Sequence, residues 1–229
     1  MKNDILKSAS SISFPDVDLE NVKGVLIDLD NTLYLYTPPH EKAMHVTWRF
    51  LKRFYPMTKE AFETDFARVW DDIFEQMGNV PSAHHRMTIF QRFAEEKGLD
   101  KPYLIAVKAN ELYFKTVFKY MKKYGPDKKA LAFLKECKKK NLPVCLVTDL
   151  FASIQTKKLE ALKLTSYIDF IVANDEACED KPSAKMFQIA CRKLCLMPEE
   201  VIMIGDNLKK DVQGAENAGI KAYHVILNK

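Results

Sequence analysis

Two aspartates at the end of an apolar segment have the spacing of a phosphate or metal site. Asp28 closes the apolar segment 22–28, and Asp30 lies two residues further on. In an extended backbone, residues two apart point to the same side. Two carboxylates about 4 Å apart repel by roughly 4 kcal/mol at an effective dielectric constant near 20. Either a cation or a proton on one acid must offset this repulsion. Taken alone, the pair also suits a turn.

Polar residues also mark the end of a second apolar segment, and further along the chain a lysine stands before a proline. Thr148 ends the segment 143–148 and Asp149 follows it, where a hydroxyl and free backbone N–H groups are able to hold an oxyanion. Lys181 precedes Pro182, which stands where we expect a helix to begin. Its ammonium is a candidate partner for carboxylates or phosphate. Judged singly, these residues are more typical of a helix cap and of a solvated surface lysine.

A second group of acids follows the segment 201–204. Gly205 allows a close approach of the backbone, Asp206 comes next, and Asp211 falls in the first turns of the following helix. Ligands of open α/β sheets bind at the carboxyl ends of the strands, where the strand order reverses. Carboxylate oxygens without His or Cys favour Mg²⁺ over Zn²⁺. The sequence therefore predicts a magnesium and phosphate site that includes Asp28, Asp30 and Asp206.

The elements that must hold these residues alternate along the chain. Short β-branched and aliphatic runs predict buried parallel strands at 22–28, 143–148, 169–173, 201–204 and 221–226. Amphipathic patterns predict helices at 128–140, 152–163, 183–195 and 208–218. From residue 128 onward, helix and strand follow each other in turn. This order indicates an α/β fold with a parallel sheet.

Residues 39–124 interrupt this alternation. We expect no strand there, but helices at 42–55, 59–76, 83–97 and 102–123. The first strand is thus separated from the rest of its sheet by a helical insertion. We expect two domains, a discontinuous core of residues 1–36 and 126–229 and a helical domain of residues 37–125.

Composition excludes several classes of protein. The chain has 229 residues, 47% of them hydrophobic and 29% charged, which is ordinary for a globular protein. The net charge is 35 − 31 = +4, too mild to predict a nucleic-acid partner, and the excess lies in residues 37–125. No apolar run is long enough for a membrane helix, and the start of the chain resembles no secretory signal. Five cysteines without a CxxC pair predict reduced thiols in a cytoplasmic protein.

The order of these motifs resembles the haloacid dehalogenase-like (HAD) hydrolase superfamily. The resemblance rests on DxDxT from Asp28, Thr148 at a strand end, the Lys181–Pro182 pair and GDxxxxD from Gly205. It covers about residues 22–226 and is similar to the class with a helical cap between the first two motifs. The resemblance implies a Rossmann-like parallel sheet of strand order 5-4-1-2-3 with an inserted helical cap domain.

Carried over to this chain, the resemblance assigns a role to each residue. It implies that Asp28 is the nucleophile and forms an aspartyl-phosphate, and that Asp30 is the general acid and base. Thr148, Lys181 and the backbone at Asp149 would bind the phosphate. Mg²⁺ would be held by the Asp28 carboxylate, the Asp30 carbonyl and the Asp206 carboxylate. A supporting set around these groups would contain Asn207, Asp211 and Asp175.

The resemblance also sets the expected activity and leaves alternatives open. Dehalogenases of this superfamily lack the second aspartate, so Asp30 favours a phosphatase acting on a small phosphorylated metabolite, such as a nucleoside monophosphate or a sugar phosphate. A phosphomutase and a non-enzymatic module that binds a phosphorylated ligand or a protein are the alternatives. We expect no nucleic-acid or membrane partner, and a monomer or a homodimer. The cap residues that would choose the substrate are not readable.

Overall fold

The computed structural model of the protein describes residue 14, residues 17–78 and residues 80–227. The chain forms two compact units, one made of Met1–Leu35 with Gly125–Lys229 and the other of Tyr36–Tyr124. The domain boundaries expected from the sequence lie one residue from these junctions.

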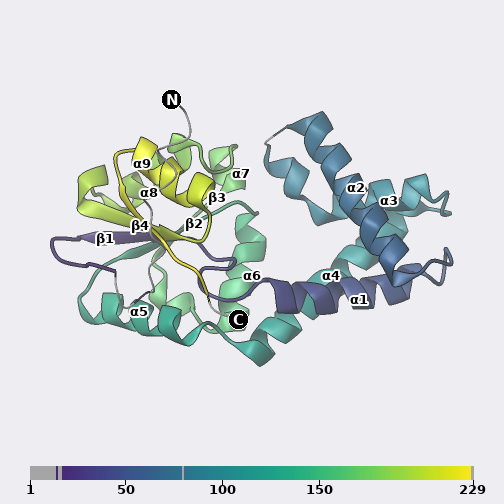
Figure 1. The fold of residues 1–229 in the computed structure, drawn as a ribbon, viewed down its shortest axis with the longest axis horizontal. Coiled ribbons are helices and arrows are strands. Elements are labelled where there is room, and N and C mark those ends of the chain that lie inside the picture. The colour runs from purple at the N-terminus through teal and green to yellow at the C-terminus, as the bar shows by residue number, and fades with distance from the viewer. Residues whose placement is uncertain (1–13, 15–16, 79, 228–229) are drawn as a thin grey trace. The chain divides into compact units, whose positions relative to one another are not determined.

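The first unit contains a five-stranded parallel sheet (Figure 1). Its strands are β1 (Gly24–Ile27), β2 (Val144–Thr148), β3 (Phe170–Ala173), β4 (Val201–Gly205) and β5 (Lys221–His224). The order is β3-β2-β1-β4-β5, which is the predicted order read from the other edge. Since β1 lies between β2 and β4, the strand order reverses at β1. The end of β1 is therefore where a ligand site is expected.

Helices connect the strands of this unit. They are α5 (Lys128–Lys139), α6 (Ala152–Leu162), α7 (Asn174–Ala177), α8 (Ala184–Leu194) and α9 (Gly214–Asn217), with short 3₁₀ turns η4 (Thr165–Tyr167) and η5 (Pro198–Glu200). Phe187 and Met186 of α8 pack against Leu26, Val147 and Met203 of the sheet, all fully buried. Each such side chain contributes about 1.5–3 kcal/mol by leaving water. This core fixes the strand ends that carry the polar residues.

Two predicted helices of this unit differ from the structure. The helix after Lys181 begins at Ala184 rather than Pro182, because Ser183 is its cap and accepts a hydrogen bond from the Lys185 N–H at 3.2 Å. The predicted helix 208–218 is divided into a π-helical segment, η6 (Leu208–Gln213), followed by α9. Such π-helical turns occur often at functional sites.

The second unit is helical, and its described residues form no strand. It contains α1 (Thr37–Leu51), α2 (Lys59–Met77), a 3₁₀ turn η3 (Pro81–His84), α3 (Arg86–Glu96) and α4 (Pro102–Tyr124). Helix α1 begins and ends earlier than the predicted helix 42–55. Its first turn accommodates two prolines, since the first N–H groups of a helix have no intrahelical partner. The buried rings of Phe62, Phe90 and Phe93 belong to its core.

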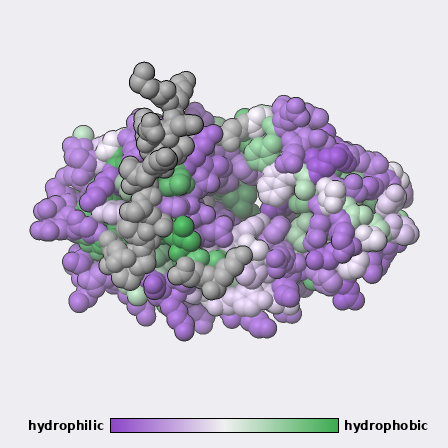
Figure 2. Space-filling model, in the orientation of Figure 1, coloured by the Kyte–Doolittle hydropathy of each residue, from purple (hydrophilic) through white to green (hydrophobic). Residues whose placement is uncertain are grey.

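Hydrophilic residues predominate on the visible face of the molecule (Figure 2). In the part of the chain that the structure describes, no helix combines the length and apolar character that crossing a membrane requires. All five cysteines carry free thiols, as the sequence predicts.

Candidate active site

All the predicted residues of the first unit except Asp175 meet in one cleft at the carboxyl ends of β1, β2 and β4. The cleft has a volume of about 220 Å³. It is lined by Asp28, Asp30, Asn31, Thr148, Asp149, Lys181, Asp206, Asn207, Lys210 and Asp211. Strands β1 and β4 are paired with Ile27 opposite Ile204, and the Asp28 N–H donates to the Ile204 carbonyl at 2.9 Å. The aspartates that follow the two strands therefore lie beside each other.

Three carboxylates form the acidic side of this cleft. Oxygen atoms of Asp28, Asp206 and Asp211 lie within 4.8 Å of one another. Asp211 fits there because residue 205 is glycine: a Cβ atom at that position would lie 2.3 Å from the Asp211 carboxyl carbon. Burial and then the charge of Asp211 raise the pKa of Asp206 to about 6. A backbone N–H and the charge of Lys181 lower this pKa only in part, so a further cation beside Asp206 would favour its ionised form.

Lys181 is the cation of this acidic side. Its ammonium donates to Asp28 at 2.7 Å, to Asp211 at 2.6 Å and to the Val147 carbonyl at 3.0 Å. The side chain is only 2% exposed. Burial lowers the pKa of Lys181, but the charges of Asp211, Asp28 and Asp149 outweigh it and raise the pKa well above its usual value. Lys181 therefore stays charged.

Asp28 has the surroundings of a nucleophile held in a fixed orientation. One carboxylate oxygen accepts from Lys181, and the other accepts from the Thr32 hydroxyl at 3.1 Å. Burial raises the pKa of Asp28 to about 8, although the charge of Lys181 lowers it. A further cation at Asp206 would favour the ionised carboxylate that nucleophilic attack requires.

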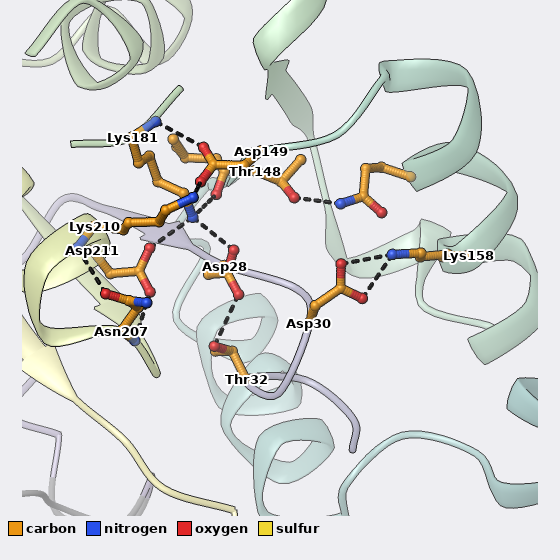
Figure 3. A network of polar contacts seen from close by, with 12 residues as sticks. Asp28, Asp30, Thr32, Thr148, Asp149, Lys158, Lys181, Asn207, Lys210 and Asp211 are labelled. Atoms are coloured by element: carbon orange, nitrogen blue, oxygen red, sulfur yellow. Dashed lines mark hydrogen bonds and ion pairs between the residues drawn. The ribbon is translucent and has the colours of Figure 1, made fainter. Parts of the chain in front are cut away.

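Asp30 faces a different lysine (Figure 3). The Lys158 ammonium donates to both of its carboxylate oxygens, at 2.7 and 2.6 Å, and the Tyr34 hydroxyl also donates to it. Burial raises the pKa of Asp30, but the charge of Lys158 and these hydrogen bonds outweigh burial, so the pKa is lowered. The repulsion expected between Asp28 and Asp30 is thus offset by one lysine for each acid.

The end of β2 supplies the remaining predicted residues. The Thr148 hydroxyl accepts a hydrogen bond from the Gln155 amide, so its own hydrogen is left to donate. The Asp149 carboxylate accepts from the Lys181 N–H at 2.7 Å and from the Lys210 ammonium at 2.8 Å. Asp149 therefore connects the segments that carry the two lysines, and a phosphate would meet its backbone rather than its carboxylate.

The supporting set expected from the sequence is brought together in part. Asp211 contacts Lys181, and the Asn207 side chain accepts from the N–H groups of Lys209 and Lys210 at the start of η6. Asp175 does not line the cleft. Its carboxylate accepts from the Ala152 N–H at 3.2 Å, where the free N–H groups at the start of α6 attract an anion.

Sequence reasoning missed four residues that bind the predicted ones, namely Tyr34, Gln155, Lys158 and Lys210. The sequence does contain a pattern that points to two of these four residues. Gln155 and Lys158 share a helix face with Leu159 and Leu162, at the spacing of an apolar stripe. Polar residues at core positions need partners, and both side chains are buried in the structure.

Comparisons of the sequence with known proteins point to one family. A family model described as haloacid dehalogenase-like hydrolase matches residues 22–219. The chain is 29% identical to a ribulose-1,5-bisphosphate 5-phosphatase of Halopiger xanaduensis, over 86% of this chain and 82% of that protein. It is 30% identical to a glyceraldehyde 3-phosphate phosphatase of Methanopyrus kandleri, over 89% of this chain and 84% of that protein.

Solved structures share the fold. A 2-haloacid dehalogenase from Pseudomonas syringae superposes with a TM-score of 0.69 at 20% identity, covering 88% of this chain and 85% of that one. A HAD phosphatase from Thermococcus onnurineus gives a TM-score of 0.64 at 22% identity, with 88% and 85% covered. At these identities the likeness establishes the architecture alone, and the chemistry must be argued from the cleft.

Proposed function

Since the chain belongs to the haloacid dehalogenase-like hydrolases and is a phosphatase, we propose that it hydrolyses a small phosphorylated metabolite through an aspartyl-phosphate on Asp28. The observation that carries this proposal is the cleft in which Asp28 and Lys181 are 2.7 Å apart, with Asp30 and Asp206 on the same lining. A carboxylate nucleophile, an acid–base group and cations are what phosphoryl transfer requires.

In the first step, a carboxylate oxygen of Asp28 attacks phosphorus. The new O–P bond forms while the ester P–O bond breaks, and a proton on Asp30 passes to the leaving oxygen to give the alcohol. The Thr148 hydroxyl and the Lys181 ammonium stabilise the charge on the phosphoryl oxygens. Lys158 lowers the pKa of Asp30, but an arriving phosphate dianion opposes this shift, since a nearby negative charge raises the pKa of a carboxyl group.

In the second step, water attacks the phosphorus of the aspartyl-phosphate. Asp30, now ionised, accepts a proton from this water as the bond between Asp28 and phosphorus breaks. Inorganic phosphate leaves, and both aspartates return to their starting protonation. One carboxylate thus serves as acid and then as base, which fits its place beside Asp28 in the cleft.

The donor set fits Mg²⁺. Asp28 and Asp206 offer hard carboxylate oxygens, and the Asp30 carbonyl is the third candidate ligand. Burial and the charge of Asp211 raise the pKa of Asp206, so a cation beside it would be favoured. When bound there, the ion would neutralise charge on the phosphate and on Asp28. Asp211 already pairs with Lys181, so we assign it the role of orienting that lysine.

The proposed substrates are sugar phosphates or related small phosphate esters, in line with the two named relatives. We propose that the helical domain predicted over residues 37–125 serves as the cap that admits these substrates. We also propose that the protein acts in the cytoplasm. Purified full-length protein tests the function directly by phosphate release from a panel of phosphorylated metabolites, with Mg²⁺ and with excess chelator. We expect release with Mg²⁺ and loss of at least about 10²-fold with chelator.

Other outcomes of this panel separate the alternatives. Transfer of phosphate between two positions of one sugar, without release, would identify a phosphomutase. Binding of phosphorylated compounds with no turnover in Mg²⁺ would contradict the proposal and favour a binding module.

Protons and Mg²⁺ are expected to compete for the same aspartates, so Mg²⁺ should stabilise the protein more at high pH. In the folded protein the pKa of Asp206 is raised to about 6 and that of Asp28 to about 8, so both hold protons at acid pH that a metal must displace. Without metal, these two groups make stability fall as pH rises from about 4 to 8, because the folded state binds more protons than the unfolded state. We expect Mg²⁺ to raise the melting temperature by several degrees near pH 8.5 and by much less near pH 5.5.

Thermal unfolding with MgCl₂, against NaCl of equal ionic strength, measures this difference. Asp206→Asn is the matched variant and should respond to Mg²⁺ weakly at both pH values. An equal Mg²⁺ effect at both pH values in the native sequence would contradict proton competition at these aspartates.

A further inference from the structure

One face of α6 carries two buried polar side chains toward the proposed catalytic groups. Gln155 and Lys158 are three residues apart, so they lie on the same side of the helix. Gln155 is fully buried and Lys158 is 2% exposed. Burying a lysine is costly unless its charge is paired, so this position requires a carboxylate partner.

The partner of Lys158 is Asp30, which lies 128 residues away in the sequence. The ammonium donates to both carboxylate oxygens, at 2.7 and 2.6 Å, so it fixes the plane of the carboxylate as well as its position. The carboxylate of Asp30 is 30% exposed, whereas its lysine is buried. One side of the acid is therefore held by the protein, while another side remains open to the cleft.

Gln155 makes the corresponding contact with Thr148. Its amide donates to the Thr148 hydroxyl oxygen, which leaves the hydroxyl hydrogen to donate elsewhere. The same helix face therefore contacts two of the residues that the sequence predicts to be catalytic, and neither contact belongs to the motifs from which those residues were predicted.

We propose that Lys158 is a positioning residue for the reaction, and that it holds the Asp30 carboxylate where it meets the leaving oxygen of the substrate. This inference rests on the proposed function, in which Asp30 protonates that oxygen. A displaced acid would slow the step in which the ester P–O bond breaks and the proton passes to the alcohol. Misplacement of a catalytic group by about 1 Å costs on the order of 10²-fold in rate.

The requirement for a proton depends on the leaving group, and this gives a sharp test. An alkyl phosphate releases a strongly basic alkoxide and needs the proton from Asp30. A 2,4-dinitrophenyl phosphate releases a stable phenolate and needs none. We measure kcat/KM, which reports the steps up to departure of the leaving group, for both substrates with native protein and with Lys158→Met.

We expect Lys158→Met to lower kcat/KM for the alkyl phosphate by on the order of 10²-fold, and for the dinitrophenyl phosphate by less than about 5-fold. Lys158→Arg, which retains the charge, should recover part of the loss. Lys157→Met is the matched control, since Lys157 is the exposed neighbour on the same helix, and it should change neither value by more than about 2-fold.

A double-mutant cycle with Asp30→Asn completes the test. If Lys158 acts through Asp30, Lys158→Met should cost the alkyl reaction less than about 3-fold once Asp30 is replaced. Equal losses on both substrates, or a full loss in the Asp30→Asn background, would overturn the proposal and assign Lys158 a structural role. Absence of turnover by the native protein on every phosphate ester would instead contradict the proposed function, so the two failures are distinguishable.

Discussion

Replacing Asp28 by asparagine is expected to abolish phosphate release, with a loss of roughly 10⁴-fold or more. The variant keeps the size of the side chain and an oxygen that accepts from Lys181 or Thr32. What it lacks is the carboxylate that forms the bond to phosphorus. Because the reaction is proposed to pass through an acyl phosphate on this residue, no neighbouring group replaces it.

Phosphate release and intact-protein mass after acid quenching together measure this prediction. Native protein trapped during turnover should show one added phosphoryl group, whereas Asp28→Asn should show none. Asp18→Asn is the control, because Asp18 is exposed and its contact with Lys221 is long, at 3.6 Å. Retention of more than about 1% of the native rate by Asp28→Asn would assign the nucleophile to water or to another residue.

The architecture could be predicted because each buried strand is an uninterrupted apolar run. β1, β2 and β4 are buried along their whole length, so their sequences show neither helical nor alternating periodicity. The strand order came from the family resemblance, since apolar runs alone do not determine which strands are neighbours. Helix ends were less accurate: α1 begins at Thr37 because prolines suit a first turn, although they suggest a break.

The sequence could predict mainly those residues of the candidate site that lie at the ends of strands. Thr148 ends a buried strand, and Asp28 and Asp206 each come directly after one, so parallel pairing brings them together. Lys158 and Lys210 bind Asp30 and Asp149 from helical segments, and these pairings are set by packing rather than by spacing in the sequence. Asp175 also follows a strand, but its carboxylate accepts from the Ala152 N–H at the start of α6.

Lys181→Met is expected to destabilise the protein far more than Lys210→Met. Its ammonium is 2% exposed and lies between the carboxylates of Asp28 and Asp211, which are 9% and 1% exposed. Methionine has a similar length but leaves both carboxylates without this cation. Removal of one partner of a buried ion pair costs about 3–5 kcal/mol, because the remaining charge stays buried without compensation.

Urea unfolding of Lys181→Met and Lys210→Met, in the absence of divalent metal, tests this difference. Lys210 is the matched control: it pairs with Asp149 in the same cleft at 2.8 Å, but its side chain is 34% exposed. Exposed pairs contribute about 0–1 kcal/mol, so Lys210→Met should move the unfolding midpoint little. Similar losses of unfolding free energy in the two variants would contradict the role of Lys181 as the buried counter-charge of the cleft.

The pH dependence of the Lys181→Met variant separates two causes of its destabilisation. If the loss of unfolding free energy shrinks as the pH is lowered, the unpaired carboxylates are taking up protons. The destabilisation is then electrostatic rather than a defect of packing.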